Sequence, residues 1–240
     1  MLGPDAPVLH EKSATPSAGH DRWIPMRLRT VTATTVAAAA VATSAVAGRR
    51  WQLRWGADGH EVTSRLPGDE LITDPDLVAT RAIAIRAHPM EVWPWVAQLG
   101  QNRGGFYSYD RLENLVGCRI HSSDRIVPEW QDVTVGDPVN LAPEVALTVA
   151  IVDPPRALVL TGGVPMAETS PPYDFTWSFV LDEHQSTTRL IVRERYAYTR
   201  WWAPLLVESV EAVSFLMHQK MLRTIRDRVE HADHHRRANA

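Results

Sequence analysis

Several short stretches between residues 79 and 198 alternate apolar and polar positions, the pattern of β-strands with one buried face. "ATRAIAIRA" at 79–87 predicts a first strand. After Pro128 the period of two returns in stretches separated by prolines, glycines and a polar turn, which predicts a meander of antiparallel strands. Its strands are "VALTVAIVD", "RALVLTGG", "DFTWSFVLDEH" and "TTRLIVRERYAY".

The last of these strands separates two kinds of side chain. Alternation places Leu190, Val192 and Glu194 on one face, and Arg189, Arg193 and Arg195 on the other. If the apolar face lines a cavity, Glu194 points into it. The alternative is an exposed glutamate near the end of a strand.

Helical spacing interrupts the strands at three places. One helix is expected at about 89–99 and a second at 108–117, with Tyr109 on its apolar face. A third, long helix is expected at 204–229, where apolar residues recur every three or four positions. Its stripe contains Leu206, Val210, Val213, Met217, Met221 and Ile225.

The N-terminal region contains one uncharged segment. Residues 1–29 have no hydrophobic period and predict a flexible tail, whereas 30–48 carry no charge and as a helix would span about 28 Å, close to a bilayer core. Tryptophans and arginines flank this segment, as at membrane interfaces. We expect a single-pass anchor in the cell membrane; a cleaved signal peptide of a secreted protein and a soluble helix of a cytoplasmic one are the alternatives.

The rest of the chain divides into three parts. Residues 49–77 include the Pro-, Gly- and Asp-rich "RLPGDELITDPDL" and predict a linker. The globular domain is expected at 78–232, followed by a tail at 233–240.

Composition excludes several classes of function. A net charge of -3 with 22% charged residues gives no basic surface for nucleic acid. The single cysteine, Cys118, allows neither an intrachain disulfide nor a multi-cysteine metal site. Gly104-Gly105 lacks the third glycine or the lysine of phosphate-binding loops, so we expect no cofactor. The C-terminal histidines lack acidic or sulfur partners at fixed spacing, so we expect no metal.

Four residues are weak catalytic candidates. His121 with Asp124 could form a base oriented by a carboxylate, and Tyr107 could polarise a carbonyl. Glu129 qualifies only if it is buried. The plainer interpretation of His-Ser-Ser-Asp is a turn whose side chains satisfy backbone amides.

Three stretches carry a family resemblance: "RAIAIRAHPMEVWPWVAQLGQNRGGFYSYDRLENLVG", "IHSSDRIVPEWQDVTVGD" and "FLMHQKMLRTIRDRVEH". They resemble bacterial SRPBCC proteins, the START-like superfamily that includes polyketide cyclase/dehydrase and lipid-transport relatives. The resemblance covers about residues 66–232, and the "WGA" at 55–57 after a hydrophobic helix is common in that subgroup. It implies an α+β helix-grip fold, a curved antiparallel sheet wrapped around a long C-terminal helix, with an N-terminal hydrophobic helix.

The resemblance also implies a mostly apolar cavity between sheet and helix, without implying one reaction. The expected lining residues are Tyr109, Trp177, Phe179, Glu194, Val213, Met217 and Met221. We expect a non-enzymatic binder or carrier of a hydrophobic small molecule or lipid, held at a membrane by residues 30–48. The alternatives are a cyclase/dehydrase-type enzyme and a protein-interaction module that docks through Trp201-Trp202. The sequence leaves the oligomeric state open.

Overall fold

The structure is a computed structural model that describes residue 40 and residues 43–115, 117–165 and 170–238, with side chains up to residue 232. The predicted tail 1–29 and most of the predicted hydrophobic helix 30–48 lie outside the described residues. Within the described ranges, no helix combines the length and the apolar character needed to cross a bilayer.

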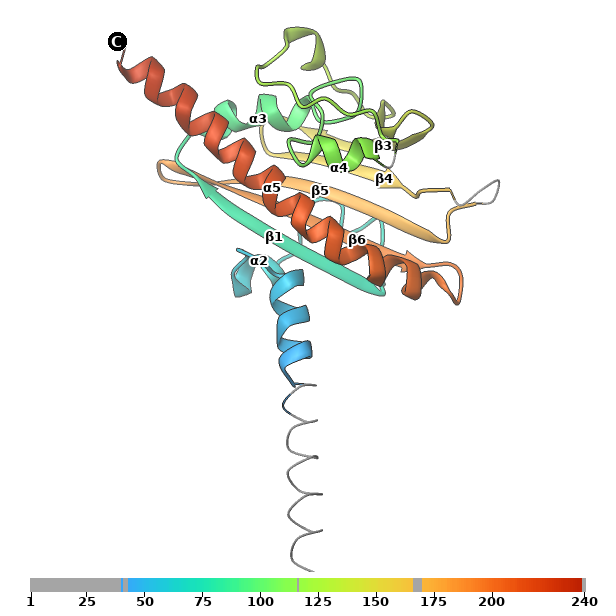
Figure 1. The fold of residues 1–240 in the computed structure, drawn as a ribbon. Helices are drawn as coiled ribbons and strands as arrows, with labels where there is room; N and C mark the ends of the chain where they lie inside the picture. The colour runs from blue at the N-terminus through green and yellow to red at the C-terminus, as the bar shows by residue number, and fades with distance from the viewer. Residues whose placement is uncertain (1–39, 41–42, 116, 166–169, 239–240) are drawn as a thin grey trace, which may run out of the picture. The chain divides into compact units, whose positions relative to one another are not determined.

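The described part of the chain contains one sheet of six antiparallel strands in the order β1-β6-β5-β4-β3-β2. The first strand therefore pairs with the last one, and the strands between them follow one another as a meander (Figure 1). The bounds are β1 (Leu77–Ile85), β2 (Pro138–Ala142), β3 (Val145–Asp153), β4 (Ala157–Gly162), β5 (Tyr173–His184) and β6 (Thr187–Tyr198).

Apart from the helical residues 43–53, the helices in the described part of the chain are short except for the last one. They are α2 (Gly59–Thr63), α3 (Pro89–Ala97), α4 (Asp110–Leu115), a 3₁₀ turn η1 (Pro128–Trp130) and α5 (Ala203–Ala238). In the tail predicted at 233–240, residues 233–238 continue α5. Nothing in "DHHRRA" breaks a helix, since the segment has neither glycine nor proline.

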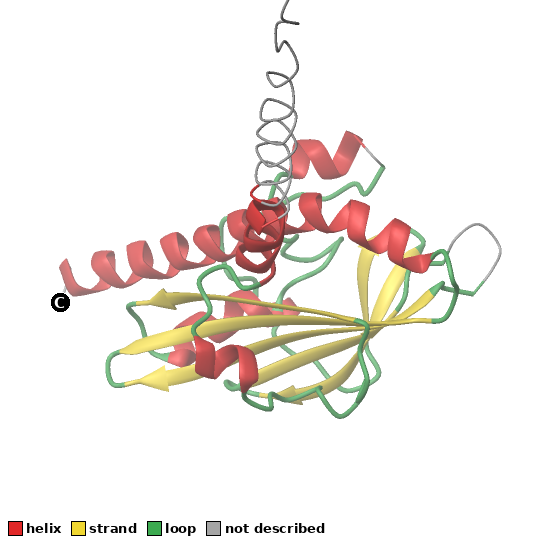
Figure 2. Cartoon of the chain, turned by 90° about the horizontal axis from the view of Figure 1, so that it is seen from below, coloured by secondary structure: helices red, strands yellow, loops and turns green. Residues whose placement is uncertain are grey.

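One face of the sheet carries the core. Inward positions of β5 hold Phe175, Trp177, Phe179 and Leu181, all buried. Both α3 and α5 pack on this face, and α5 extends along the length of the strands (Figures 1 and 2). Each fully buried large apolar side chain contributes about 1.5–3 kcal/mol, so this layer is the main source of stability. The arrangement confirms the predicted α+β helix-grip architecture.

The other face of the sheet is covered by the segment predicted to be a linker. Residues 49–77 contain α2, and Leu66 packs with Ala82 and Ile191 of the sheet. Arg193 of β6 donates hydrogen bonds to Asp69 Oδ2 at 2.7 Å and to the backbone carbonyl of Ser64 at 2.9 Å. The outward arginines of β6 need anionic and carbonyl partners, and this segment supplies them, so it packs instead of hanging free.

Candidate ligand cavity

A cavity of about 280 Å³ lies between the inward face of the sheet, α5 and the loops around α4. Of the residues expected to line it, the structure places five in its wall: Trp177, Glu194, Val213, Met217 and Met221. Further apolar and aromatic lining comes from Phe106, Ile120, Tyr173, Phe175 and Tyr196. The volume is near the lower end of the range for small-molecule sites, about 300–1,000 Å³.

Strand register and helix period bring these side chains together. Trp177 of β5 stands opposite Glu194 of β6, and Phe175 stands opposite Tyr196, so four inward side chains form one wall. On the opposite wall, α5 presents Val213, Met217 and Met221 at intervals of four residues, which place them on one side of a helix.

Two predicted cavity residues do not line it. Tyr109 is 47% exposed, because the apolar face of α4 points outward instead of packing. Phe179 is fully buried in the core beyond the cavity. Alternation correctly gave the inward face of β5, but it cannot tell which inward positions meet the helix and which meet empty space.

The cavity contains a polar corner formed by α5 and β5. His218 Nδ1 lies 2.9 Å from the backbone carbonyl oxygen of Ser214 and 3.2 Å from the hydroxyl of the same residue. The carbonyl can only accept and is the nearer of the two, so we assign the proton to Nδ1. The His218 ring meets Trp177 edge to face, with ring centroids 5.3 Å apart. Both residues are more than nine-tenths buried, yet His218 Nε2 and Trp177 Nε1 have no hydrogen-bond partner among the described residues.

A buried ion cluster stands behind this corner. Arg81 of β1 donates to Glu194 Oε2 at 2.6 Å and to Glu211 of α5, and all three side chains are at most 3% exposed. The hydroxyl of Tyr196 donates to Glu194 Oε1 at 3.2 Å, which is also 3.9 Å from His218 Nε2. Glu194 thus joins the ion cluster to the cavity.

The cluster holds its members in different protonation states. Burial alone would raise the pKa of Glu194, but the charges of His218 and Arg81 and the hydrogen bonds it accepts hold that pKa below its usual value. Burial, and then the charge of Glu194, raise the pKa of Glu211 to about 7. Burial lowers the pKa of His218, although the charge of Glu194 opposes this shift. The charged imidazole that lowers the pKa of Glu194 therefore forms only at a pH below the ordinary histidine value of 6.5.

The raised pKa of Glu211 predicts a specific pH dependence of stability. Below the ordinary glutamate pKa of 4.5, Glu211 is protonated in both the folded and the unfolded chain, and its contribution is fully present. As the pH rises through about 7, the unfolded chain has already released this proton, so ~3 kcal/mol of stability is lost.

Glu211→Gln, which stays neutral, tests this dependence. Urea unfolding from pH 4.5 to 8 should show wild type losing about 3 kcal/mol relative to the variant. A difference between the two proteins that stays constant with pH would contradict the assignment.

A second polar group borders the cavity at α4. Glu113 is buried and accepts a hydrogen bond from the Ser108 hydroxyl at 2.9 Å, while its other oxygen has no hydrogen-bond partner in the part of the chain that the structure describes. Burial raises the pKa of Glu113, and burial followed by the charge of Glu113 raises the pKa of the Cys118 thiol. Cys118 is therefore a poor nucleophile.

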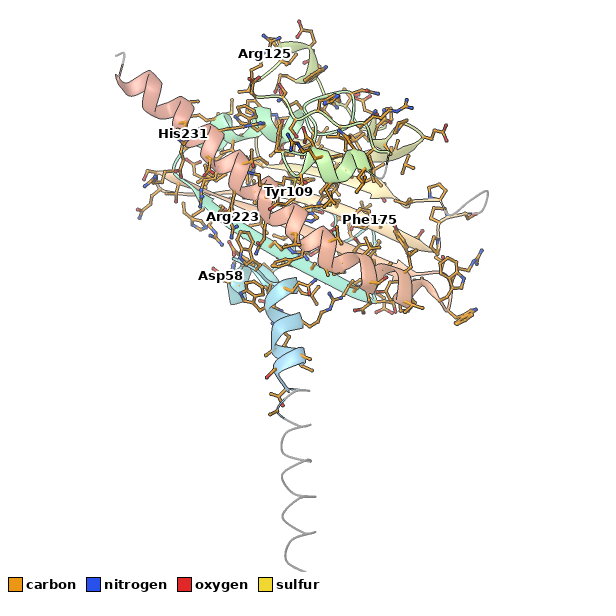
Figure 3. All side chains as sticks on the ribbon, viewed as in Figure 1. Asp58, Tyr109, Arg125, Phe175, Arg223 and His231 are labelled. Carbon is orange, nitrogen blue, oxygen red and sulfur yellow. The ribbon has the colours of Figure 1, made fainter. Side chains whose placement is uncertain are left out.

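The predicted catalytic residues do not gather at the cavity. His121 and Asp124 are exposed on a loop, and Glu129 is exposed in η1. In Figure 3, Arg125, which follows Asp124, lies in the loops at the top of the view, away from Phe175 at the cavity. Asp124 is exposed, and the hydrogen bonds that order this loop go to Asp110, which accepts from the backbone amide and the hydroxyl of Ser122.

Tyr107 is buried in the core and has a structural role. Its hydroxyl accepts a hydrogen bond from Gln98 at 2.9 Å, and burial raises its pKa above the ordinary value. The residue sits outside the cavity wall. A tyrosine held in this way does not reach a ligand in the cavity.

Outside the cavity, the described residues offer one open cleft and no metal site. They contain no group of three or more His, Cys, Asp or Glu side chains placed to hold a metal ion. An open cleft of about 580 Å³ on the outer face is lined by Arg54, Arg65, Arg193 and Arg195 together with Asp69 and Glu70. Arg193 and Arg195 are already bonded to Asp69 and backbone carbonyls there.

Sequence reasoning missed the residues that form the polar corner and the ion cluster. Glu211 is a polar residue off the apolar stripe of α5, a pattern that predicts exposure, but it is 1% exposed. The available signal was Arg81, a charge within the apolar alternation of the first strand, which called for a buried anionic partner.

Comparison with known proteins finds fold neighbours only. No protein-family profile matches the chain, and no curated protein matches it. Similar solved structures include protein MLL2253 from Mesorhizobium loti, with 16% identity over 61% of this chain and 96% of that one and a TM-score of 0.36.

A second is CalU16 from Micromonospora echinospora, with 15% identity over 64% of this chain and 84% of that one and a TM-score of 0.32. A third is a polyketide cyclase-like protein. This third protein, Cgl2372 from Corynebacterium glutamicum, has 14% identity over 66% of this chain and 94% of its own, with a TM-score of 0.33. The sheet order and the long C-terminal helix described above give this chain a helix-grip fold.

Proposed function

We propose that this protein binds a small, mostly apolar molecule in the cavity between β5, β6 and α5. The observation that carries the proposal is the cavity itself, about 280 Å³ lined mainly by aromatic and aliphatic side chains. Enclosed apolar surface with a few convergent polar groups is the usual make-up of a small-molecule site. Met217 and Met221 add walls that adapt to a ligand's shape.

Binding without catalysis is the form that the described residues favour. The acid–base candidates expected from the sequence are dispersed over exposed loops or locked in the core. Membrane attachment through residues 30–48 stays a prediction, and so does the choice between a lipid and another apolar ligand.

A cavity-filling substitution tests the proposal. Met217→Trp, on the cavity wall, should lower the affinity of the full chain for naphthalene at least about tenfold, because the larger ring takes up space that the probe needs. Equilibrium dialysis measures the affinity.

The matched control is Leu216→Trp, on the same helix. Leu216 is 52% exposed and lies outside the cavity wall, so this variant should bind naphthalene as wild type does. Equal losses in both variants, or no binding by wild type, would contradict the proposal.

A further inference from the structure

The polar corner of the cavity defines what the ligand must carry. His218 Nδ1 is committed to the Ser214 carbonyl, which leaves Nε2 as a bare acceptor. The indole Nε1–H of Trp177 is a donor and nothing else. Both residues line the cavity, and neither nitrogen atom has a hydrogen-bond partner among the described residues, although a buried polar atom without a partner is expensive.

One kind of group satisfies both atoms at once. A hydroxyl accepts one hydrogen bond and donates another, so a single ligand O–H can receive the Trp177 proton and give its own to His218. The two rings are in edge contact, 5.3 Å between centroids, so they belong to the same corner. A carbonyl or an ether accepts only and leaves Nε2 unpaired, and a hydrocarbon leaves both unpaired.

The ion cluster disfavours an anionic group at the same corner. Glu194 Oε1 lies 3.9 Å from His218 Nε2, and Arg81 is already shared between two carboxylates, Glu194 and Glu211. A ligand carboxylate here would be buried next to the negative charge of Glu194, and the nearby arginine is already paired. A neutral hydroxyl carries no such penalty.

Resting on the proposed function, we propose that the ligand is a neutral hydroxylated molecule, an alcohol or a phenol, whose O–H is anchored between Trp177 Nε1 and His218 Nε2. The apolar remainder of the ligand then lies against Phe175 and the methionines of α5.

Three probes of similar shape test the inference with the full chain: 2-naphthol, 2-methoxynaphthalene and 2-methylnaphthalene. In equilibrium dialysis at pH 7, 2-naphthol should bind at least about tenfold more tightly than either of the others, because it alone pairs both atoms. Equal affinities for all three would overturn the hydroxyl anchor and leave the proposed function standing. Binding of none of them would overturn both.

Two variants of one residue assign the effect to His218. The amide nitrogen of Asn matches the position of Nδ1, so His218→Asn keeps a donor for the Ser214 carbonyl but removes the acceptor at Nε2. It should abolish the preference for 2-naphthol over 2-methylnaphthalene. The amide of Gln reaches the position of Nε2, so His218→Gln should retain most of the preference. A preference unchanged in His218→Asn would overturn the assignment.

Discussion

Replacing Arg81 by methionine is expected to lower the free energy of unfolding by ~3–5 kcal/mol at pH 8. The side chain is 1% exposed and holds Glu194 and Glu211, which are equally buried. Without the guanidinium, two buried carboxylates lose their hydrogen-bonded cation, and either their charge is desolvated with less compensation or they take up protons. Urea unfolding followed by circular dichroism measures the loss.

The control for Arg81 is another arginine near the end of β1. Arg86 pairs with Glu230 at 2.9 Å, but its side chain is 81% exposed, so Arg86→Met should cost less than about 1 kcal/mol. In a triple variant, Arg81→Met with Glu194→Leu and Glu211→Met, most of the loss should be recovered, because no unpaired charge remains. Similar losses for the two single variants would contradict the buried cluster.

Replacing Gly56 by alanine is expected to destabilise the domain by ~3 kcal/mol. Its φ is +72°, a conformation that alanine adopts only under strain, and an added Cβ would lie 2.0 Å from the backbone oxygen of Ala82 in β1. The contact is with main chain, which cannot rotate away. Relief therefore requires the preceding residue to break its hydrogen bond, in which the Ala82 amide donates to the Trp55 carbonyl.

A glycine three positions further along provides the comparison. An added Cβ at Gly59, the first residue of α2, meets nothing within 4 Å. Gly59→Ala should therefore leave the thermal midpoint unchanged or raise it slightly, because alanine favours helix. If Gly56→Ala were equally harmless, residues 49–77 would be a linker after all.

The strands and the long helix were predictable because their patterns are local. Alternation in "TTRLIVRERYAY" alone places Glu194 and the outward arginines on opposite faces of β6, and the structure has them there. The short β2 escaped prediction, since it begins at Pro138 and has a single fully buried apolar residue, Val139. A strand of this kind carries no clear period.

The site was less predictable because it depends on pairings between distant residues. Arg81 and Glu211 are 130 positions apart in the chain. The apolar stripe chosen from the sequence contains Val210 and Val213, which are about half exposed, whereas the buried side of α5 contains Val207, Glu211, Phe215 and His218. Because the stripe was placed off-centre, both polar residues were missed. Candidates chosen by neighbourhood in sequence, such as His121 and Asp124, were exposed loop residues instead.

The packing of residues 49–77 also depends on residues far away in the sequence. Its Pro, Gly and Asp content is typical of a connector, yet Asp69 and the carbonyls around Ser64 are the partners that Arg193 needs. Whether such a segment is free or packed depends on the surface it meets, and this surface is formed by residues more than 100 positions later.

Native mass spectrometry of the purified full chain tests the central claim, ligand binding in the cavity, most directly. We expect the folded protein to carry a stoichiometric additional mass that is released by organic extraction, is rich in hydrocarbon and contains a hydroxyl group. The same preparation of Met217→Trp should lack that mass, while Leu216→Trp should keep it. A wild-type chain of apoprotein mass alone, with no gain when naphthalene or 2-naphthol is added, would contradict the account.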